Sequence, residues 1–288
     1  MIAMQVGNVE SAQLYSGGNI RATDVAGLKV LLEGREGSLN NYRLFHSVNG
    51  PEAPVGFEAP RHRHNFEQFR LPLSGGFEYR PGKILPQGWV GYFPEGVHYG
   101  PQIRHPGLAL LTLQFGGASR SGYMSSAQRR EGFETLNRRG KFEKGAFVWT
   151  DDKGQRHNQD AFEAVWEGWM GRKLEYPTPR YNDLVFMNPD AFAWMADPKA
   201  PGVSRKPLGT FTEIGVQAAL VRLDPGAEFQ LGSQSAIEVL FLIKGKLSNG
   251  GQSFAANSAF SCDPTEPLEF LKTVEGAECI LFHLSIIE

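Results

Sequence analysis

Apolar residues in the first half of the chain gather in short runs separated by turn residues. Within these runs, aromatic and branched side chains alternate with polar ones, a period that indicates β-strands rather than helices. Turn signals such as SGG, RPGK, LPQG and PEGV stand between the runs. Several short strands at this spacing predict an all-β sandwich or small barrel. The expected strands cover residues 28–34, 41–48, 66–75, 77–82, 88–96 and 108–116.

The pattern becomes helical between residues 119 and 180. One helix is expected at 124–140 and a second at 157–171, where apolar residues recur at helical spacing. Asn158 is the expected N-cap of the second helix, and Gly171 is its expected stop. We interpret 119–180 as a short helical connector.

A second β block follows the connector. Its expected strands cover 216–226, 237–248, 252–262, 268–274 and 277–287. The segment before the first strand is polar and lacks periodicity, so we expect a loose arm or an edge segment there. The predicted organisation is an N-terminal arm at 1–25, a first β domain at 26–118, the connector at 119–180 and a second β domain at 181–288.

Composition excludes several classes of partner. Of the 288 residues, 41% are hydrophobic and 21% are charged, with a formal net charge of −2. This balance is typical of a globular protein and gives no reason to expect a nucleic acid or membrane partner. No run approaches the length of a membrane span, and no signal peptide is visible. With only Cys262 and Cys279 as cysteines, a reducing cytoplasm is the expected location.

The stretch from Gly56 to Gly75 carries the most distinctive chemistry in the chain. It reads GFEAPRHRHNFEQFRLPLSG, with His62 and His64 two residues apart and Gln68 four residues further on. On an extended strand, side chains at even separations point to the same face. A pair of imidazoles with a third donor suits a transition metal such as Fe, Mn, Ni or Zn. The spacing therefore predicts a metal site.

Two further residues of this stretch bear on the site. Glu67 is the alternative third ligand, because a carboxylate is the better donor for a hard ion. Alternation favours Gln68, although a β-bulge would reverse this choice. Arg70 shares the parity of the histidines and is expected to point into the same space. It would either bind a substrate carboxylate or enolate in a bidentate manner, or pair with a nearby acidic residue.

The second β block repeats the layout of the first, which indicates duplication of one β domain. Gly232, Gln234 and Glu238 stand at the positions of the two histidines and the glutamine. The only histidine of the second block is His283. The second copy is therefore expected to have lost its site and to serve a structural purpose.

The first stretch resembles the first motif of the cupin superfamily, G-(X)5-H-X-H-(X)3,4-E-(X)6-G, with Gln68 in the glutamate position. Gly88, Pro94 and Gly96 match the second cupin motif, G-(X)5-P-X-G-(X)2-H-(X)3-N. Its histidine arrives one residue early, at His98, and its asparagine is absent. The early histidine reflects either a shortened turn or a residue that does not bind metal.

The resemblance implies an all-β fold of two double-stranded β-helix (jelly-roll) cupin barrels with a short helical connector, a bicupin. It also implies one divalent transition metal in the N-terminal barrel, with iron favoured over Mn, Ni or Zn. The implied ligands are His62, His64, Gln68 and His98.

The expected function is that of a metal-dependent cupin enzyme, most simply a dioxygenase-type oxidoreductase. The substrate is expected to be small, oxygen-bearing and anionic, and Arg70 and Tyr99 are the candidate catalytic residues. The alternatives are a metal-dependent isomerase or lyase, or a non-catalytic bicupin that binds a small ligand. A homodimer is a further expectation, because exposed jelly-roll strands can pair between subunits.

Overall fold

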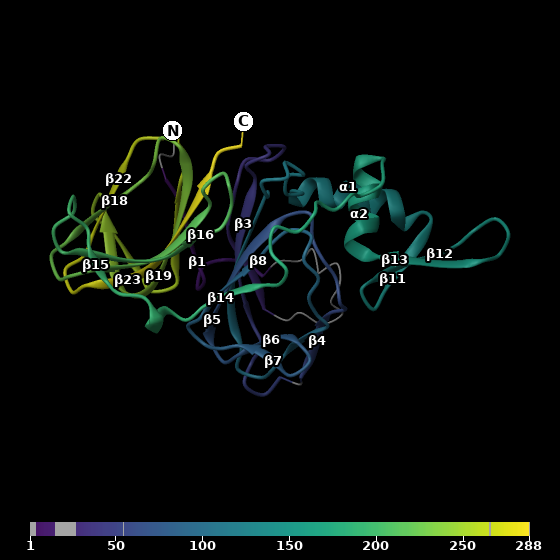
Figure 1. Cartoon of the computed structure of the whole chain (residues 1–288), viewed down its shortest axis with the longest axis horizontal. Helices are drawn as coiled ribbons and strands as arrows, with labels where there is room; N and C mark the ends of the chain where they lie inside the picture. Colours follow the sequence, from purple (N-terminus) through teal and green to yellow (C-terminus); the bar gives the residue numbers. More distant parts are fainter. Residues whose placement is uncertain (1–3, 15–26, 54, 265, 288) are drawn as a thin grey trace. The chain divides into compact units, whose positions relative to one another are not determined.

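The structure is a computed structural model that describes residues 4–14, 27–53, 55–264 and 266–287 (Figure 1). Antiparallel strands are the main regular secondary structure of this part, together with the helices α1 (Ser126–Asn137) and α2 (Ala161–Met170) and the 3-10 helix η1 (Pro189–Ala191). The predicted all-β class is therefore confirmed. None of the helices described there is long and apolar enough to cross a membrane.

The chain forms two compact units, and neither is continuous in sequence. The unit that holds the first barrel, called the N-terminal unit below, consists of Leu14–Lys29 and Glu33–Phe186. The C-terminal unit consists of Met1–Gln13, Val30–Leu32 and Met187–Glu288.

Two sheets form the barrel of the N-terminal unit. The larger has the order β14-β8-β5-β10-β3-β2, and the smaller has the order β4-β9-β6-β7. The larger sheet contains β2 (Leu28–Glu33), β3 (Tyr42–Val48), β5 (Glu67–Ser74), β8 (Val90–Phe93), β10 (Ala109–Phe115) and β14 (Val185–Met187). The smaller contains β4 (Gly56–Ala59), β6 (Phe77–Arg80), β7 (Lys83–Leu85) and β9 (Gln102–Arg104).

The apolar core of this barrel includes Phe77, Phe93, Tyr99 and Leu110. Residues that share the face of Phe93 in the register of the larger sheet therefore point into the barrel. On β5 and β10 this face carries the polar residues Gln68, Arg70, Thr112 and Gln114.

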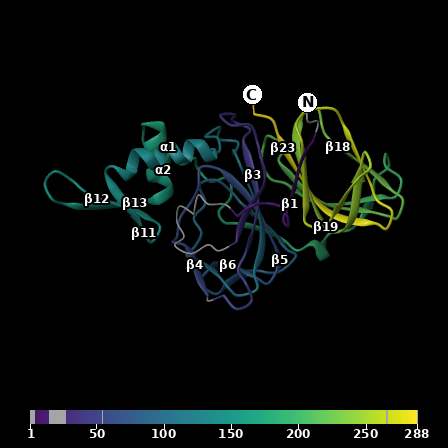
Figure 2. The same cartoon turned by 180° about the vertical axis from the view of Figure 1, so that it is seen from behind.

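The predicted connector is a lobe rather than a pair of helices alone. It contains α1, α2 and a three-stranded sheet of β11 (Gly140–Glu143), β12 (Ala146–Thr150) and β13 (Arg156–Asp160), which group together in both views (Figures 1 and 2). A helix start at Asn158 is wrong, because Asn158 pairs with Val148 inside the sheet. Asp160 is the N-cap, since its side chain accepts hydrogen bonds from the amides of Phe162 and Glu163. Gly171 ends the helix in the left-handed conformation, as predicted.

The C-terminal unit repeats this architecture. Its main sheet has the order β1-β21-β19-β23-β17-β16-β15, and β18, β20 and β22 complete the barrel. The strands are β1 (Gln5–Asn8), β15 (Met195–Ala196), β16 (Val203–Thr210), β17 (Gln217–Leu223), β18 (Glu228–Leu231), β19 (Ala236–Asn249), β20 (Gln252–Ala255), β21 (Ser258–Cys262), β22 (Glu269–Lys272) and β23 (Ala277–Ser285). Within the predicted arm, β1 is an edge strand paired with β21. Residues 1–3 and 15–25 of that arm lie outside the described residues.

The order β8-β5-β10-β3 in one barrel matches β21-β19-β23-β17 in the other. Gln68 lies opposite Phe93 and Gln114, and Glu238 lies opposite Cys262 and His283. Gln68 and Glu238 are therefore equivalent positions, so the structure confirms the predicted internal repeat.

Candidate functional site

The two motifs predicted to build the site meet through backbone hydrogen bonds. The amide of His62 donates to the carbonyl of Tyr99 at 2.8 Å, and the amide of Tyr99 donates back at 2.9 Å. The amide of Gly96 donates to the carbonyl of His64, also at 2.8 Å. These bonds hold the histidine segment and the segment after Pro94 side by side.

The two histidines lie together and are each 6% exposed. Their ring centroids are 4.9 Å apart, with the ring planes at 76°. His62 Nδ1 is 2.6 Å from the carbonyl oxygen of Pro60. Because a carbonyl only accepts hydrogen bonds, this contact places a proton on Nδ1, and in the neutral ring it leaves the lone pair on Nε2. A backbone carbonyl that orients a histidine in this way is a common arrangement behind metal-binding imidazoles.

Gln68 points toward the histidine side of the barrel, as alternation predicted. Its Nε2 donates to the Tyr99 hydroxyl at 2.6 Å. Its Oε1 accepts from Arg70 Nη2 and from Gln114 Nε2, both at 3.0 Å. Since a guanidinium can only donate, the amide oxygen must face Arg70 and the amide nitrogen must face Tyr99. Gln68 therefore presents a donor, not its carbonyl oxygen, to Tyr99.

Glu67 lies on the opposite face of β5, fully buried. Its Oε1 is 3.6 Å from Arg180 Nη1, which is also 2.6 Å from Oε1 of the buried Glu95. Burial, followed by the neighbouring Glu67 carboxylate, raises the pKa of Tyr92 well above its usual range. Of the two candidates for the third ligand, Gln68 is thus the one that points inward, and Glu67 belongs to a separate buried ion-pair cluster.

Arg70 lies inside the barrel and is 5% exposed. Its guanidinium carbon is 4.8 Å from the ring centres of both Phe77 and Phe93 and 5.6 Å from that of Tyr99. Cation–π contacts at these distances stabilise a guanidinium that has been removed from water. The predicted inward direction of Arg70 is confirmed, and it carries a positive charge beside Gln68 and Tyr99.

His98 does not join the other two histidines. Tyr99 is the residue bridged directly to His62, and neighbouring residues of an extended segment point to opposite faces. Burial, and then Arg61 and Arg63, lower the pKa of His98, which lies partly buried on that other face. In the part of the chain that the structure describes, no three His, Cys, Asp or Glu residues are grouped to hold a metal.

Tyr99 occupies the place that the motif assigns to its histidine. Three residues after Gly96, the second-motif spacing falls on Tyr99. Its ring centroid is 4.5 Å from that of His62 and 5.9 Å from that of His64. Strict counting along the motif would have identified this position, whereas the search for a histidine led to His98.

The lobe also reaches the site, which sequence reasoning missed. Phe162 of α2 makes an edge contact with the His64 ring at 5.3 Å, and Phe66 packs on the same ring at 4.2 Å. Phe66 belongs to the apolar core of the lobe. No local pattern in the sequence links residue 162 to residue 64, so only the fold reveals this cover over the histidine.

The donors present fit a transition metal, but not through the four predicted residues. His62 and His64 supply imidazole nitrogens, and the Tyr99 ring beside them carries a hydroxyl; nitrogen and oxygen donors together are a mixed set that iron and manganese accept. The Gln68 carbonyl oxygen already accepts two hydrogen bonds, one of them from a cation. The two imidazoles are therefore the candidate metal donors of this site, and Gln68 is their neighbour.

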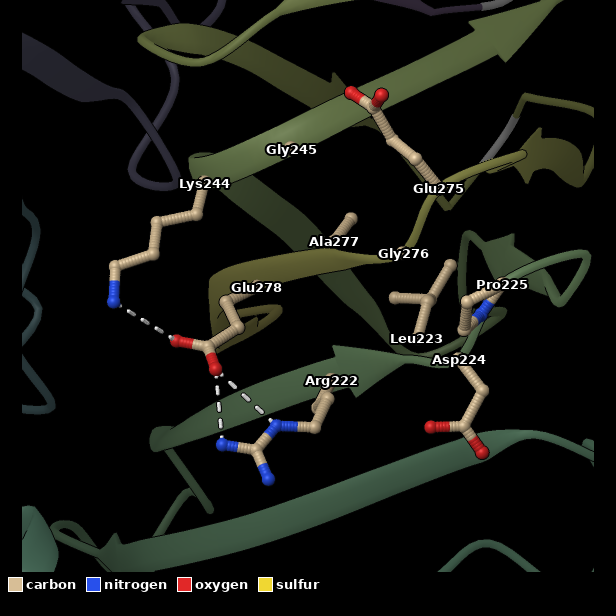
Figure 3. A pocket seen from close by; sticks show the side chains of 10 residues that line it. All are labelled: Arg222, Leu223, Asp224, Pro225, Lys244, Gly245, Glu275, Gly276, Ala277 and Glu278. Atoms are coloured by element: carbon tan, nitrogen blue, oxygen red, sulfur yellow. Dashed lines mark hydrogen bonds and ion pairs between the residues drawn. The ribbon is translucent and has the colours of Figure 1, made fainter.

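The C-terminal barrel has different chemistry at the equivalent positions. Glu238 accepts from the amide of Gly232 at 2.8 Å, and its Oε1 is 3.6 Å from His283 Nδ1. Leu240 stands where Arg70 stands, and Leu281 where Thr112 stands. A hollow of about 310 Å³ in this unit is lined by ion-paired surface residues, including Arg222, Lys244 and Glu278 (Figure 3).

No family model matches the chain, and no curated protein is similar to it in sequence. Solved structures do match. A protein of Nostoc punctiforme described as a candidate dioxygenase has a TM-score of 0.62 and 12% identity, over 99% of this chain and 87% of that one. Escherichia coli Ylba has a TM-score of 0.55 and 9% identity, over 99% and 93%. A variant of Bacillus subtilis oxalate decarboxylase has a TM-score of 0.52 and 12% identity, over 99% and 78%.

At this level of identity the likeness shows the fold alone. The structural neighbours are cupin jelly-roll proteins, and the match extends over nearly the whole of this chain. The chain therefore shares the jelly-roll fold of these proteins over nearly its whole length.

Proposed function

We propose that the chain is a metal-dependent cupin enzyme of the dioxygenase type and that its active site lies in the N-terminal barrel. One observation carries the proposal. His62, His64, Tyr99, Gln68 and Arg70 converge on one buried region, while the second barrel has Glu238 and Leu240 in place of Gln68 and Arg70. A shared frame in which the first barrel alone pairs two histidines with an inward arginine indicates one active barrel.

Arg70 is the group that would bind the substrate. A buried guanidinium is costly unless an anion or strong acceptors compensate it. Its planar donors match the oxygens of a carboxylate or an enolate, and Phe77 and Phe93 fix its position. We therefore infer a small, oxygen-bearing anionic substrate.

His62 and His64 would hold the metal, through the lone pair that the Pro60 contact leaves on Nε2 in the case of His62. Such an ion, when bound, supplies Lewis-acid polarisation and, for iron, oxygen activation. The chain's own contribution is orientation and the exclusion of water. Phe66 and Phe162 cover the His64 ring, which limits solvent at the imidazoles.

Oxygen consumption by the iron-loaded full chain tests the proposal. A panel of diketones, catechols and hydroxy acids should include compounds whose turnover consumes oxygen. An Arg70→Leu variant should turn these compounds over with a raised KM. Turnover of panel compounds without oxygen uptake would overturn the dioxygenase class and favour a lyase or isomerase. Full turnover by metal-free protein would overturn the metal-dependent function.

A further inference from the structure

We propose that Tyr99 is the anionic metal ligand of the N-terminal barrel and that Gln68 supports it as a hydrogen-bond donor. This inference rests on the proposed function, because it requires a metal at His62 and His64. It differs from the implied ligand set at two positions: Gln68 is removed from that set, and Tyr99 replaces His98.

The first argument is position. The backbone bridge between His62 and Tyr99 sets the two residues directly opposite each other. Residues opposed in this way project to the same side. The Tyr99 ring contacts the rings of both histidines, at 4.5 and 5.9 Å between centroids. Tyr99 is thus the oxygen-bearing side chain best placed to complete the histidine pair.

The second argument is the direction of a hydrogen-bond chain. Tyr123 donates its hydroxyl to Gln114 Oε1 at 2.8 Å, and Gln114 Nε2 donates to Gln68 Oε1 at 3.0 Å. Arg70 adds a second donor to the same Gln68 oxygen. Gln68 Nε2 then donates to Tyr99 at 2.6 Å. Each link fixes the next, so the chain ends with a donor aimed at the Tyr99 oxygen.

The third argument is charge. Gln68 stands where the motif has glutamate, so the site has lost the anion that would offset a cation. Glu67 and Glu95 are engaged on the other face with Arg180, and Arg70 adds positive charge nearby. A tyrosinate at position 99 restores one negative charge. A short donor such as Gln68 Nε2 favours that anion, because hydrogen bonds to charged acceptors are the stronger ones.

The binding step is a proton exchange without electron transfer. An oxygen–metal bond forms at Tyr99 as its O–H bond breaks, and the proton passes to solvent. Hard trivalent iron is the metal that a phenolate oxygen suits best. Phenolate bound to Fe(III) absorbs visible light by charge transfer from oxygen to iron, which gives a signature independent of activity.

The test is titration of metal-free full chain with Fe(III) delivered from a weak chelator. One equivalent should bind and produce a visible absorption band with tyrosinate modes in resonance Raman spectra. Tyr99→Phe should remove the band. Tyr92→Phe should keep it, because Tyr92 is equally buried but faces Glu67 on the opposite side. Tyr99→His should fold and bind iron through an imidazole, and it should give no band because the phenolate is gone.

Gln68→Leu gives a second readout. Loss of the donor should move the band to longer wavelength and weaken iron binding by roughly 10–100-fold, the usual effect of removing a group behind a ligand. Colourless iron binding that depends on His62 and His64 would overturn the Tyr99 assignment and leave the proposed function intact. Failure of the wild-type chain to bind iron, with or without colour, would overturn both.

Discussion

The two barrels of this chain share a strand order but not an interior. In the first barrel, β10 and β5 pair Thr112 with Arg70. At the equivalent places of the second barrel, Leu281 pairs with Leu240. The first interior holds an arginine hydrogen-bonded to an amide, whereas the second is apolar at the equivalent places and keeps the polar pair of Glu238 and His283. The jelly roll therefore accommodates either a polar or an apolar interior. A few inward positions determine whether a barrel carries groups capable of catalysis.

The difference also concerns how each barrel is stabilised. Apolar burial of the kind found in the second barrel contributes about 25 cal/mol per Å² removed from water. Buried ion pairs such as those of Glu67 and Glu95 with Arg180 contribute little net stability but are costly to break. Substitutions can therefore separate the two barrels by activity and by stability.

The largest effect is expected from removal of the histidine pair. The His62→Ala, His64→Ala double variant should lose its bound transition metal and nearly all metal-dependent turnover. Gln234→Ala is the matched control, because Gln234 is exposed in the second barrel at the position aligned with His64. Elemental analysis of protein purified without chelator measures the difference. Retention of stoichiometric metal by the double variant would show that the second barrel, or another site, binds it.

The next largest effect is expected at the ion-pair cluster of the N-terminal unit. Arg180→Leu leaves the fully buried carboxylates of Glu67 and Glu95 without this partner. The expected loss of stability is about 3–5 kcal/mol, seen as a lower urea midpoint. Arg222→Leu in the C-terminal unit is the comparison, since its pair with Glu278 is exposed and worth at most about 1 kcal/mol. Equal losses in the two variants would contradict the distinction.

Arg70→Leu gives the first barrel the leucine that the second barrel has at the equivalent interior position. Loss of a charged hydrogen-bond donor should weaken binding of a carboxylate ligand by about 10–100-fold. Thermal stability should change little, because the substitution also removes a buried charge. Calorimetric titration and a melting curve separate the two effects. A large loss of stability with unchanged ligand affinity would assign Arg70 a structural role.

The smallest effect is expected from lowering the pH. Burial, followed by Lys29 and Arg104, lowers the pKa of His46 from 6.5 to about 4. The unfolded chain therefore takes up a proton as pH falls below 6.5, while the native chain does so only near pH 4. The stability from neutral His46 is complete above pH 6.5 and should be roughly 2 kcal/mol lower at pH 5.

Leu220 stands at the equivalent place in the second barrel, opposite Ile280 as His46 stands opposite Leu111. His46→Leu should therefore flatten the pH profile of unfolding between pH 7 and pH 5. An unchanged slope in urea titrations of this variant would assign the pH dependence to other groups.

Local sequence rules predicted most of the fold. Alternation placed Gln68 and Arg70 inside the barrel and Glu67 outside it, because β5 is regular over this stretch. The lobe was harder to predict. The strand β13 is polar and partly exposed, and residues 157–160 were predicted as the start of a helix that in fact begins at Ala161, after its N-cap Asp160.

The site was predicted in part, for a different reason. His62 and His64 follow from a local motif, but the contact of Tyr99 with them depends on pairing between distant segments. The orientation of the Gln68 amide depends on Arg70, Gln114 and Tyr99 together. Such a network is a property of the folded barrel and has no counterpart in residue spacing.

The strand β1 has a consequence for how this molecule is made. Asn8 donates to Ser258 at 2.9 Å, a contact between residues 250 apart, so β1 can pair only after β21 has been synthesised. Closure of such a long loop slows folding. A fragment that starts at Met187 would leave β21 as a bare edge, open to pairing with other chains. Expression of the second barrel alone should therefore favour aggregation unless residues 5–8 are supplied.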